Sequence, residues 1–241
     1  MLIASPRGGF SFLKGISPYS AGAVASPGYE IEHATLGPPL PLRAGFDRVA
    51  RHLAALGRPK QALCGMELRS PRPFTFQGFS DFNAGYVKVL MSWDIFQDGL
   101  NPVARTNVAP EIDPPSEPAL YGFSYTVAAK DAPKTFVVAG AGELPEGSLD
   151  PHDVVRRGET SADAVAGKAR FVMGLMTSRL AGLGVGWPQA TVTGVYTVHD
   201  IHPLLSAGAL RPVVVWHYAR PPIVSIEFEM DVRGCRRELV L

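Results

Sequence analysis

Residues 53–57 read LAALG, and residues 180–184 read LAGLG. A few residues further on, and close behind a proline, each stretch is followed by Gln-Ala, at 61–62 and at 189–190. In both places the match lies between an apolar segment with helical spacing and a strand-like segment. Because the two matches occur at nearly the same offset, they indicate an internal duplication of the chain.

Working outward from these matches, the two halves show the same order of expected elements. The first half is expected to contain strands at 29–33, 62–68, 106–109 and 119–129, helices at 42–57 and 81–96, and a stiff proline connector at 38–41. The second half is expected to contain strands at 135–141, 190–198, 212–218 and 223–232, a long helix at 161–183, and a short helix or turn at 200–207. Each half thus reads strand–helix–strand–helix–strand–strand.

This order predicts an α+β fold of two tandem domains, residues 1–130 and 131–241. Each domain is expected to be a mixed sheet with two helices packed on one face. The composition agrees, since 46% of the 241 residues are apolar, which is enough for a core. The 25 glycines and 22 prolines favour many turns and short strands over a helical bundle.

Charge and cysteine content limit the possible partners and compartments. With 23 basic and 22 acidic side chains the chain has no basic footprint for nucleic acid. It has no apolar run as long as a membrane span and no signal-peptide core at its start. Two cysteines are too few for a disulfide framework and fit a reducing compartment. The sequence therefore predicts a cytoplasmic protein without membrane or nucleic-acid partners.

Several short motifs resemble the RidA (YjgF-type) family. They are SPYS at 17–20, NAGY at 83–86, VARTNV at 103–108, TFVVAGAG at 135–142 and IEFE at 226–229. The resemblance implies a chorismate-mutase-like fold and cleavage of reactive enamines or imines without a cofactor. The tandem layout is similar to the aminomuconate deaminase group of aromatic-degradation pathways. Members of the family form trimers, so the resemblance also implies a homo-oligomer, with a trimer of tandem chains favoured.

The two halves depart from the family pattern in opposite ways. The family pairs a carboxylate-binding arginine with a glutamate on the last strand of the same domain. Here the first half has Arg105 but no glutamate at 120–124, whereas the second half has Glu227 but Leu-Arg-Pro at 210–212 in place of the arginine motif. The resemblance therefore implies one composite site to which both halves contribute.

Arg105 and Glu227 are the first candidate catalytic residues. A guanidinium is a planar fork that suits a carboxylate, although an arginine at a strand start can equally pair with a surface acid. Glu227 alternates with Glu229 and Asp231 along the expected last strand. One acid of this row could move protons in a secluded site, and the alternative is a solvated sheet face. Glu227 is preferred because it aligns with the family position.

The remaining candidates are His199 as an acid or base, and Tyr19, Asn83, Arg211 and Trp216 as substrate-binding residues. The intrinsic pKa of histidine lies near neutrality, which suits proton transfer. Tyr19 could cover a pocket mouth or simply pack there. Asn83 could bind substrate or cap a helix that starts near residue 81. Trp216 could line a site for a flat substrate, with Arg211 or Arg220 taking a second carboxylate; the alternative is packing against another subunit.

A metal site at 199–202, which reads HDIH, is the weaker reading of that segment. Two imidazoles and a carboxylate are plausible ligands, but the segment falls at a strand-to-helix junction, where Asp200 is a natural cap. We therefore expect neither a metal nor another cofactor.

The leading hypothesis is a hydrolytic deaminase that acts on a 2-aminomuconate-type enamine and releases ammonia. Two alternatives stay open. One is a hydrolase or lyase acting on a chorismate-type enol-ether acid, which would release no ammonia. The other is a non-catalytic small-molecule-binding module, since a fold does not determine a function.

Overall fold

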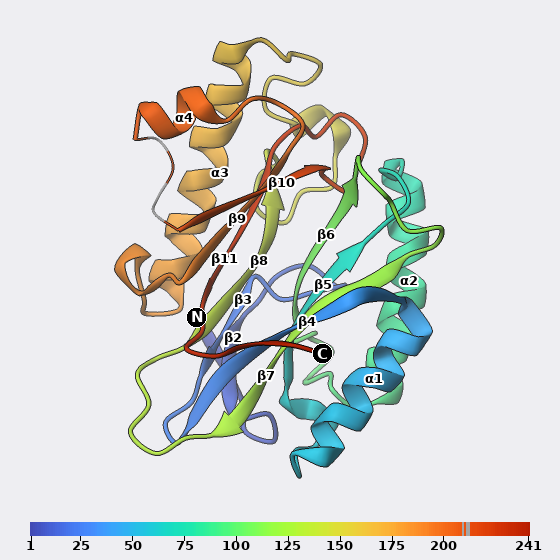
Figure 1. Ribbon diagram of the computed structural model, residues 1–241, viewed down its shortest axis with the longest axis vertical. Helices are drawn as coiled ribbons and strands as arrows, with labels where there is room; N and C mark the ends of the chain where they lie inside the picture. Colours follow the sequence, from blue (N-terminus) through green and yellow to red (C-terminus); the bar gives the residue numbers. More distant parts are fainter. Residues whose placement is uncertain (209, 211–212) are drawn as a thin grey trace.

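The computed structural model describes residues 1–208, 210 and 213–241 (Figure 1). Its helices are α1 (Leu42–Ala55), α2 (Phe76–Ser92), α3 (Ala162–Gly182) and α4 (His202–Ser206). Its strands are β1 (Leu2–Ser5), β2 (Phe10–Leu13), β3 (Gly22–Ala25), β4 (Tyr29–Pro41), β5 (Leu63–Arg69), β6 (Ala104–Pro110), β7 (Ala119–Ala128), β8 (Phe136–Gly142), β9 (Val192–Thr197), β10 (Val214–Arg220), β11 (Glu229–Gly234) and β12 (Glu238–Val240). Among these helices, none is long and apolar enough to cross a membrane.

The strands form one sheet that contains the same four-stranded block twice. In the first block β4 pairs antiparallel with β7, β7 pairs antiparallel with β5, and β5 pairs parallel with β6. The second block has the same order and directions, with β8, β11, β9 and β10. The prediction of a tandem α+β fold is therefore confirmed.

The two blocks also exchange strands. The N-terminal strand β3 pairs with β8 of the second block, and the C-terminal strand β12 pairs with β4 of the first. A short antiparallel pairing between β10 and β6 closes the junction on the other side. Both ends of the chain are thus bound to the opposite half, which ties the halves into one body.

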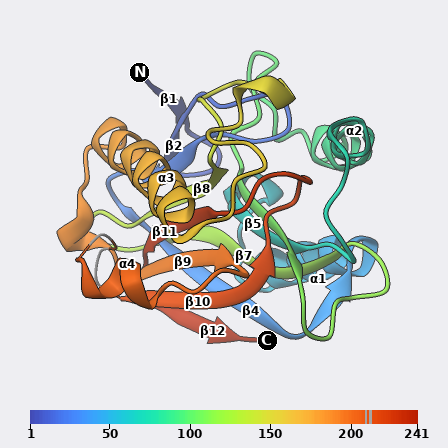
Figure 2. The same cartoon turned by 90° about the horizontal axis from the view of Figure 1, so that it is seen from above.

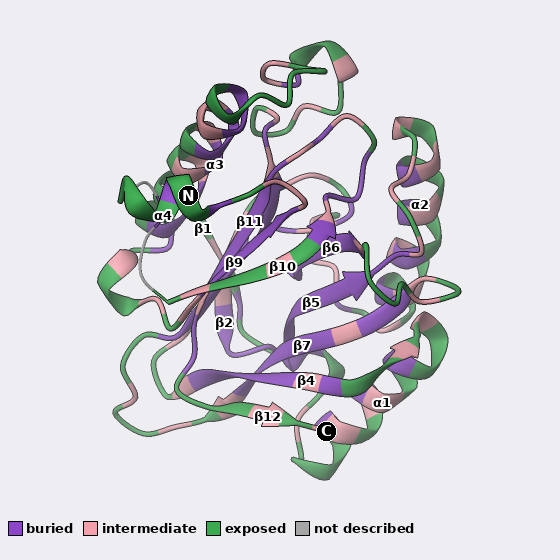
Figure 3. Ribbon diagram, turned by 45° about the horizontal axis from the view of Figure 1, so that its top comes forward, coloured by how far each residue is buried: buried purple, intermediate pink, exposed green. Residues whose placement is uncertain are grey.

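The helices lie on the outside and the inner sheet faces meet between the halves. Figure 2 shows α3 and α4 on one side of the strands and α1 and α2 on the other. One apolar core lies under α3 and α4 and a second under α1 and α2. A third apolar cluster, which includes Phe12, Ile31 and Val137, lies between the blocks. Figure 3 shows most of the strands as buried, β10 and β12 as largely exposed, and the helices as exposed on their outer sides.

The long helix α3 follows its sequence signals closely. Ser161 Oγ accepts a hydrogen bond from the Ala164 N–H at 3.2 Å, as expected of an N-cap. Val165, Val172 and Leu180 are buried and form one apolar stripe along the helix. The C-terminal stop at Gly184, with φ of 70°, also agrees with the repeated LAGLG motif.

Three predicted boundaries are wrong. Helix α2 begins at Phe76, not at 81, because Thr75 caps it by accepting from the Gly78 N–H at 3.0 Å. Strand β4 runs through the predicted proline connector to Pro41. Strand β11 begins only at Glu229, because Ser225 adopts φ of 75° and interrupts the extended run expected from residue 223.

A buried ion pair fixes the approach to β11. Lys168 Nζ of α3 contacts Glu143 Oε1 at 2.9 Å, and both side chains are fully buried. The same carboxylate accepts from the backbone N–H groups of Glu227 at 2.7 Å and Phe228 at 3.0 Å. Burial raises the pKa of Glu143, and the hydrogen bond from Lys168 partly opposes this. The pair therefore joins α3, the end of β8 and the start of β11.

We expect Lys168→Met to destabilise the protein by about 3–5 kcal/mol, because it leaves a buried carboxylate without its partner. Urea unfolding followed by circular dichroism would measure the loss. Arg170→Met, two residues further along the same helix at an exposed position, is the matched control and should change stability by less than about 0.5 kcal/mol. Equal stabilities for the two variants would contradict the expectation.

Candidate active site

A small cavity lies where the inner faces of the two blocks meet. Arg105 of β6 lines it from the first half, and Gly140 of β8 and Glu229 of β11 line it from the second. Tyr19 and Arg179 are also among its polar lining residues. The free volume is about 70 Å³. The two halves of the chain therefore contribute to one site.

Arg105 borders this cavity and has hydrogen-bond donors without a partner. It is only 3% exposed, and its Nη1 donates to Asn83 Oδ1 at 2.7 Å. The guanidinium lies over the rings of Tyr19 and Tyr86, at 4.7 and 4.9 Å from their centroids. Its Nε and Nη2 are buried without a partner. Because unsatisfied buried donors on a charged group are costly, this arrangement suits an anionic ligand that accepts from both.

Glu229 lies on the other side of the cavity, in surroundings that favour the protonated form of its carboxyl. Burial raises the pKa of its carboxyl well above the usual value, and repulsion from Asp231 raises it further. The positive charge of Arg105 opposes this rise without cancelling it. A carboxyl with a raised pKa can give and take a proton near neutral pH.

Gly140 provides the space that the Glu229 carboxylate occupies. A Cβ at this position would collide with Glu229 Oε1 and would come within 3.0 Å of Thr106 Cγ2. The glycine is therefore required by the close approach of β8 to the Glu229 side chain, since its φ is not in the left-handed region.

We expect Gly140→Ala to lower kcat by roughly 10- to 100-fold while the protein stays folded, because Glu229 must shift within the cavity. A steady-state assay and thermal unfolding would check the two parts. Ala141→Gly, at the next residue on β8, is the control and should retain most of the activity. Unchanged kcat in the Gly140→Ala variant would show that the position of Glu229 does not matter.

A second arginine, Arg179 of α3, borders the same cavity. Its Nη1 donates to the Ala139 carbonyl at 2.9 Å. Its Nε and Nη2 donate to the two carboxylate oxygens of Glu146, at 3.0 and 2.9 Å. Glu146 belongs to the loop of residues 143–149 that follows β8 and covers one side of the cavity.

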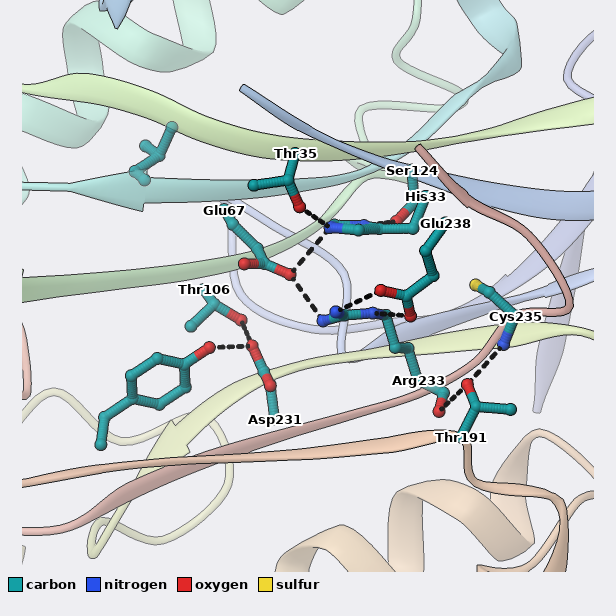
Figure 4. Close-up of polar contacts among 12 residues, drawn as sticks. His33, Thr35, Glu67, Thr106, Ser124, Thr191, Asp231, Arg233, Cys235 and Glu238 are labelled. Carbon is teal, nitrogen blue, oxygen red and sulfur yellow. Dashed lines mark hydrogen bonds and ion pairs between the residues drawn. The ribbon is translucent and has the colours of Figure 1, made fainter. Parts of the chain in front are cut away.

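A buried polar cluster connects β11 to β5, β6 and β9 through side-chain contacts (Figure 4). Asp231 Oδ2 accepts from Thr106 Oγ1 at 2.6 Å and from Tyr196 Oη at 3.0 Å. Burial, together with the charge of Glu67, raises the pKa of Asp231 to about 6. Glu67 in turn contacts Arg233 Nη1 at 3.1 Å. Since Asp231 and Glu229 share one face of β11, this cluster also sets where Glu229 lies.

The structure brings three of the predicted residues together. Arg105, Asn83 and Tyr19 are in mutual contact through the Arg105 guanidinium. The alternative interpretation, in which Asn83 caps a helix, is wrong, because Asn83 lies in the middle of α2 and is buried against Arg105. Arg211 lies outside the described residues.

The other predicted residues form a separate cluster. His199 Nε2 contacts Glu227 Oε2 at 2.9 Å, and neither residue lines the cavity. Thr197 Oγ1 donates to the Glu227 carbonyl, and Trp216 Nε1 donates to the Thr197 carbonyl at 3.0 Å. The expectation that Arg105 and Glu227 would share a cavity is therefore not met, since Glu229 takes that place.

Sequence reasoning missed Glu229, Arg179 and Asn107 as cavity residues. Glu229 was visible as an acid two residues after Glu227, but the choice between them depends on where the strand starts. Arg179 lies within a regular helix, where no motif in the sequence distinguishes it from an ordinary surface arginine. Asn107 follows Arg105 by two residues on β6, and its buried Nδ2 has no partner; strand alternation alone could have suggested it.

The fold and the cavity together define an α+β protein with a small cavity between two repeated sheet blocks. The crystal structure of a chorismatase has this fold, with a TM-score of 0.53 and 11% identity over 97% of this chain and 79% of that one. The YjgF protein of E. coli aligns with 43% of this chain and 81% of its own, at 18% identity and a TM-score of 0.29.

The sequence comparisons identify the family. The model of the family described as 2-aminomuconate deaminase CnbZ matches residues 2–239, and the chain belongs to this family. A 2-amino-5-chloromuconate deaminase from Comamonas testosteroni is 45% identical over 248 residues, which cover 100% of this chain and 98% of the relative. The prediction of an enzyme of the aminomuconate deaminase group is therefore confirmed.

Proposed function

We propose that this enzyme hydrolyses a 2-aminomuconate-type enamine to the 2-oxo acid and ammonia, and that the cavity between the halves is its active site. The observation that carries the proposal is the buried Arg105, whose Nε and Nη2 have no partner and which shares the cavity with Glu229. The chlorinated substrate named for the Comamonas relative is a second candidate substrate of the same class.

The substrate carboxylate next to the C–N bond would be bound by Arg105 Nε and Nη2. Asn83 holds the guanidinium through Nη1, so the remaining edge is oriented before substrate arrives. Tyr19 packs against the guanidinium and lines the same cavity, where it would contact the planar chain of the substrate.

Glu229 would manage the protons. The enamine first becomes an imine when its amino nitrogen loses a proton and the neighbouring chain gains one. Water then adds to the C=N carbon, giving up a proton while the nitrogen takes one. Finally the carbinolamine hydroxyl loses its proton and the nitrogen gains one, so that the C–N bond breaks, ammonia leaves and a C=O bond remains. A carboxyl with a raised pKa, placed beside the carboxylate clamp, can serve each transfer. No oxidant or reductant is needed.

The tandem chain would divide into two domains after residue 130, in the turn between β7 and β8. Strands β3 and β12 would then be exchanged between the two domains.

We also propose a cytoplasmic trimer of tandem chains. Exposed apolar side chains on β10, namely Val215, Trp216 and Tyr218, supply a surface for association between chains. Light scattering after size-exclusion chromatography would measure the assembly, and a monomer at micromolar concentration would contradict it.

The assay that tests the function measures ammonia and the 2-oxo acid from 2-aminomuconate, its 5-chloro analogue and chorismate. Ammonia from the first two substrates supports the proposal. Release of pyruvate from chorismate without ammonia would replace it with the enol-ether alternative. Thermal stabilisation by these compounds without any product would indicate a binding module.

A further inference from the structure

Arg179 already holds a carboxylate that belongs to the protein itself. Its Nε and Nη2 form two parallel hydrogen bonds to Glu146, the geometry by which arginine binds free carboxylates. The Arg179 side chain is 9% exposed, whereas that of Glu146 is 47% exposed. The cation is therefore a fixed part of the cavity lining, and its anion sits at the solvent side.

The guanidinium would keep its place if Glu146 left. Nη1 is bound to the Ala139 carbonyl of β8, so one edge of Arg179 is anchored to the sheet independently of the loop. Burial raises the pKa values of Tyr19 and Glu229, and the positive charge of Arg179 partly opposes both rises. The charge of Arg179 therefore acts on two other residues that line the cavity.

The loop that carries Glu146 is held firmly at its base. At the base, Glu143 is buried and its carbonyl accepts from the Val155 N–H at 2.9 Å. Further along the loop, Glu146 lies between Pro145 and Gly147, and Gly147 has a φ of 82°. Residues 144–149 line the cavity. The Glu146–Arg179 pair ties this part of the loop to α3.

The cavity as it stands is too small for the proposed substrate. Its free volume is about 70 Å³, whereas a cavity that binds benzene has a volume of about 150 Å³. A six-carbon chain with a carboxylate at each end is larger than benzene. Outward movement of Glu146 would enlarge the cavity and free the Arg179 fork in the same step.

We propose that Arg179 binds the second carboxylate of a dicarboxylate substrate, and that Glu146 occupies this subsite until the substrate displaces it. This inference rests on the proposed function for its choice of ligand. Arg105 and Arg179 come from different halves of the chain, so the cavity has an anion-binding group from each half and selects a molecule that is anionic at both ends.

The test is a binding measurement with two unreactive probes of equal chain length, muconate and sorbate. Muconate has a carboxylate at both ends and sorbate at one, so their comparison isolates the second carboxylate. Titration calorimetry on the full-length protein gives both affinities without any turnover. The binding result therefore stands whether or not the ammonia assay supports the deaminase assignment.

The proposal predicts opposite changes in muconate affinity for two variants. Arg179→Met should weaken muconate binding by about 10- to 100-fold and leave sorbate binding within about twofold, since it removes a charge-assisted carboxylate contact. Glu146→Ala should strengthen muconate binding by roughly 2- to 10-fold, because it removes a partly exposed competitor for Arg179. Sorbate needs the same space but has no second carboxylate for Arg179, so its gain should be smaller. Asp150→Asn, which removes an exposed negative charge close to the same loop, controls for general electrostatics and should change neither affinity.

Two results would overturn the proposal. One is an equal loss of muconate and sorbate binding in Arg179→Met, which would indicate a structural role for the arginine. The other is an unchanged muconate affinity in Glu146→Ala, which does not depend on whether the Arg179 variant folds.

Discussion

Arg105→Met is expected to lower kcat/KM for 2-aminomuconate by about 10²- to 10⁴-fold. Two charge-assisted hydrogen bonds to the substrate carboxylate disappear, each contributing roughly 1.5–3 kcal/mol. The buried Nε and Nη2 have no other partner to share this role. Ammonia release under kcat/KM conditions is the measurement.

The same variant should remain folded and at least as stable as the wild type. Burial lowers the pKa of Arg105, because removal from water disfavours its charged form. Methionine fits the surrounding rings of Tyr19, Phe79 and Tyr86 without a charge. Arg105→Lys is the informative companion, since it keeps the charge but loses the planar fork, and it should recover only a small part of the activity. Near-wild-type turnover by Arg105→Met would refute the carboxylate clamp.

The tandem fold was accessible from sequence because its signals are local and repeated. The LAALG and LAGLG helix ends, each followed by Gln-Ala, mark equivalent places in the two blocks, and the cap at Ser161 is explicit. The exchange of β3 and β12 between the halves was not predicted. Pairing between distant strands depends on the packing of the whole sheet. The sequences of these short terminal segments do not indicate which strands they pair with.

The acid favoured by the sequence, Glu227, lies outside the cavity, and Glu229, two residues further on, lines it. Strict alternation from residue 223 puts Glu227 and Glu229 on one face, so the pattern cannot choose between them. The choice is made by Ser225, whose positive φ breaks the run, and by Glu143, which binds the N–H groups of Glu227 and Phe228. Neither effect has a signature in the sequence near Glu227.

Glu229→Gln is expected to lower kcat by at least about 100-fold, the usual minimum contribution of a positioned acid or base. Glutamine has nearly the same size but cannot exchange a proton in this range. Glu227→Gln is the matched control on the same segment, and because Glu227 pairs with His199 outside the cavity, it should keep most of its activity. A larger loss of kcat in Glu227→Gln than in Glu229→Gln would instead assign the catalytic role to Glu227 and His199.

The pH dependence of stability separates this role from a packing role. The pKa of Glu229 is raised in the folded protein, so the folded state holds this proton more tightly than the unfolded chain. The stabilisation from that proton is fully present below the ordinary carboxyl pKa of about 4.3 and is lost as the pH rises through the raised folded value. Glutamine imitates the protonated form at every pH. The Tm of Glu229→Gln should therefore equal that of the wild type near pH 4 and exceed it increasingly towards pH 8, while kcat stays low throughout. A Tm difference that does not change with pH would show that Glu229 has the same proton affinity folded and unfolded, and an acid–base role at neutral pH would then lose its physical basis.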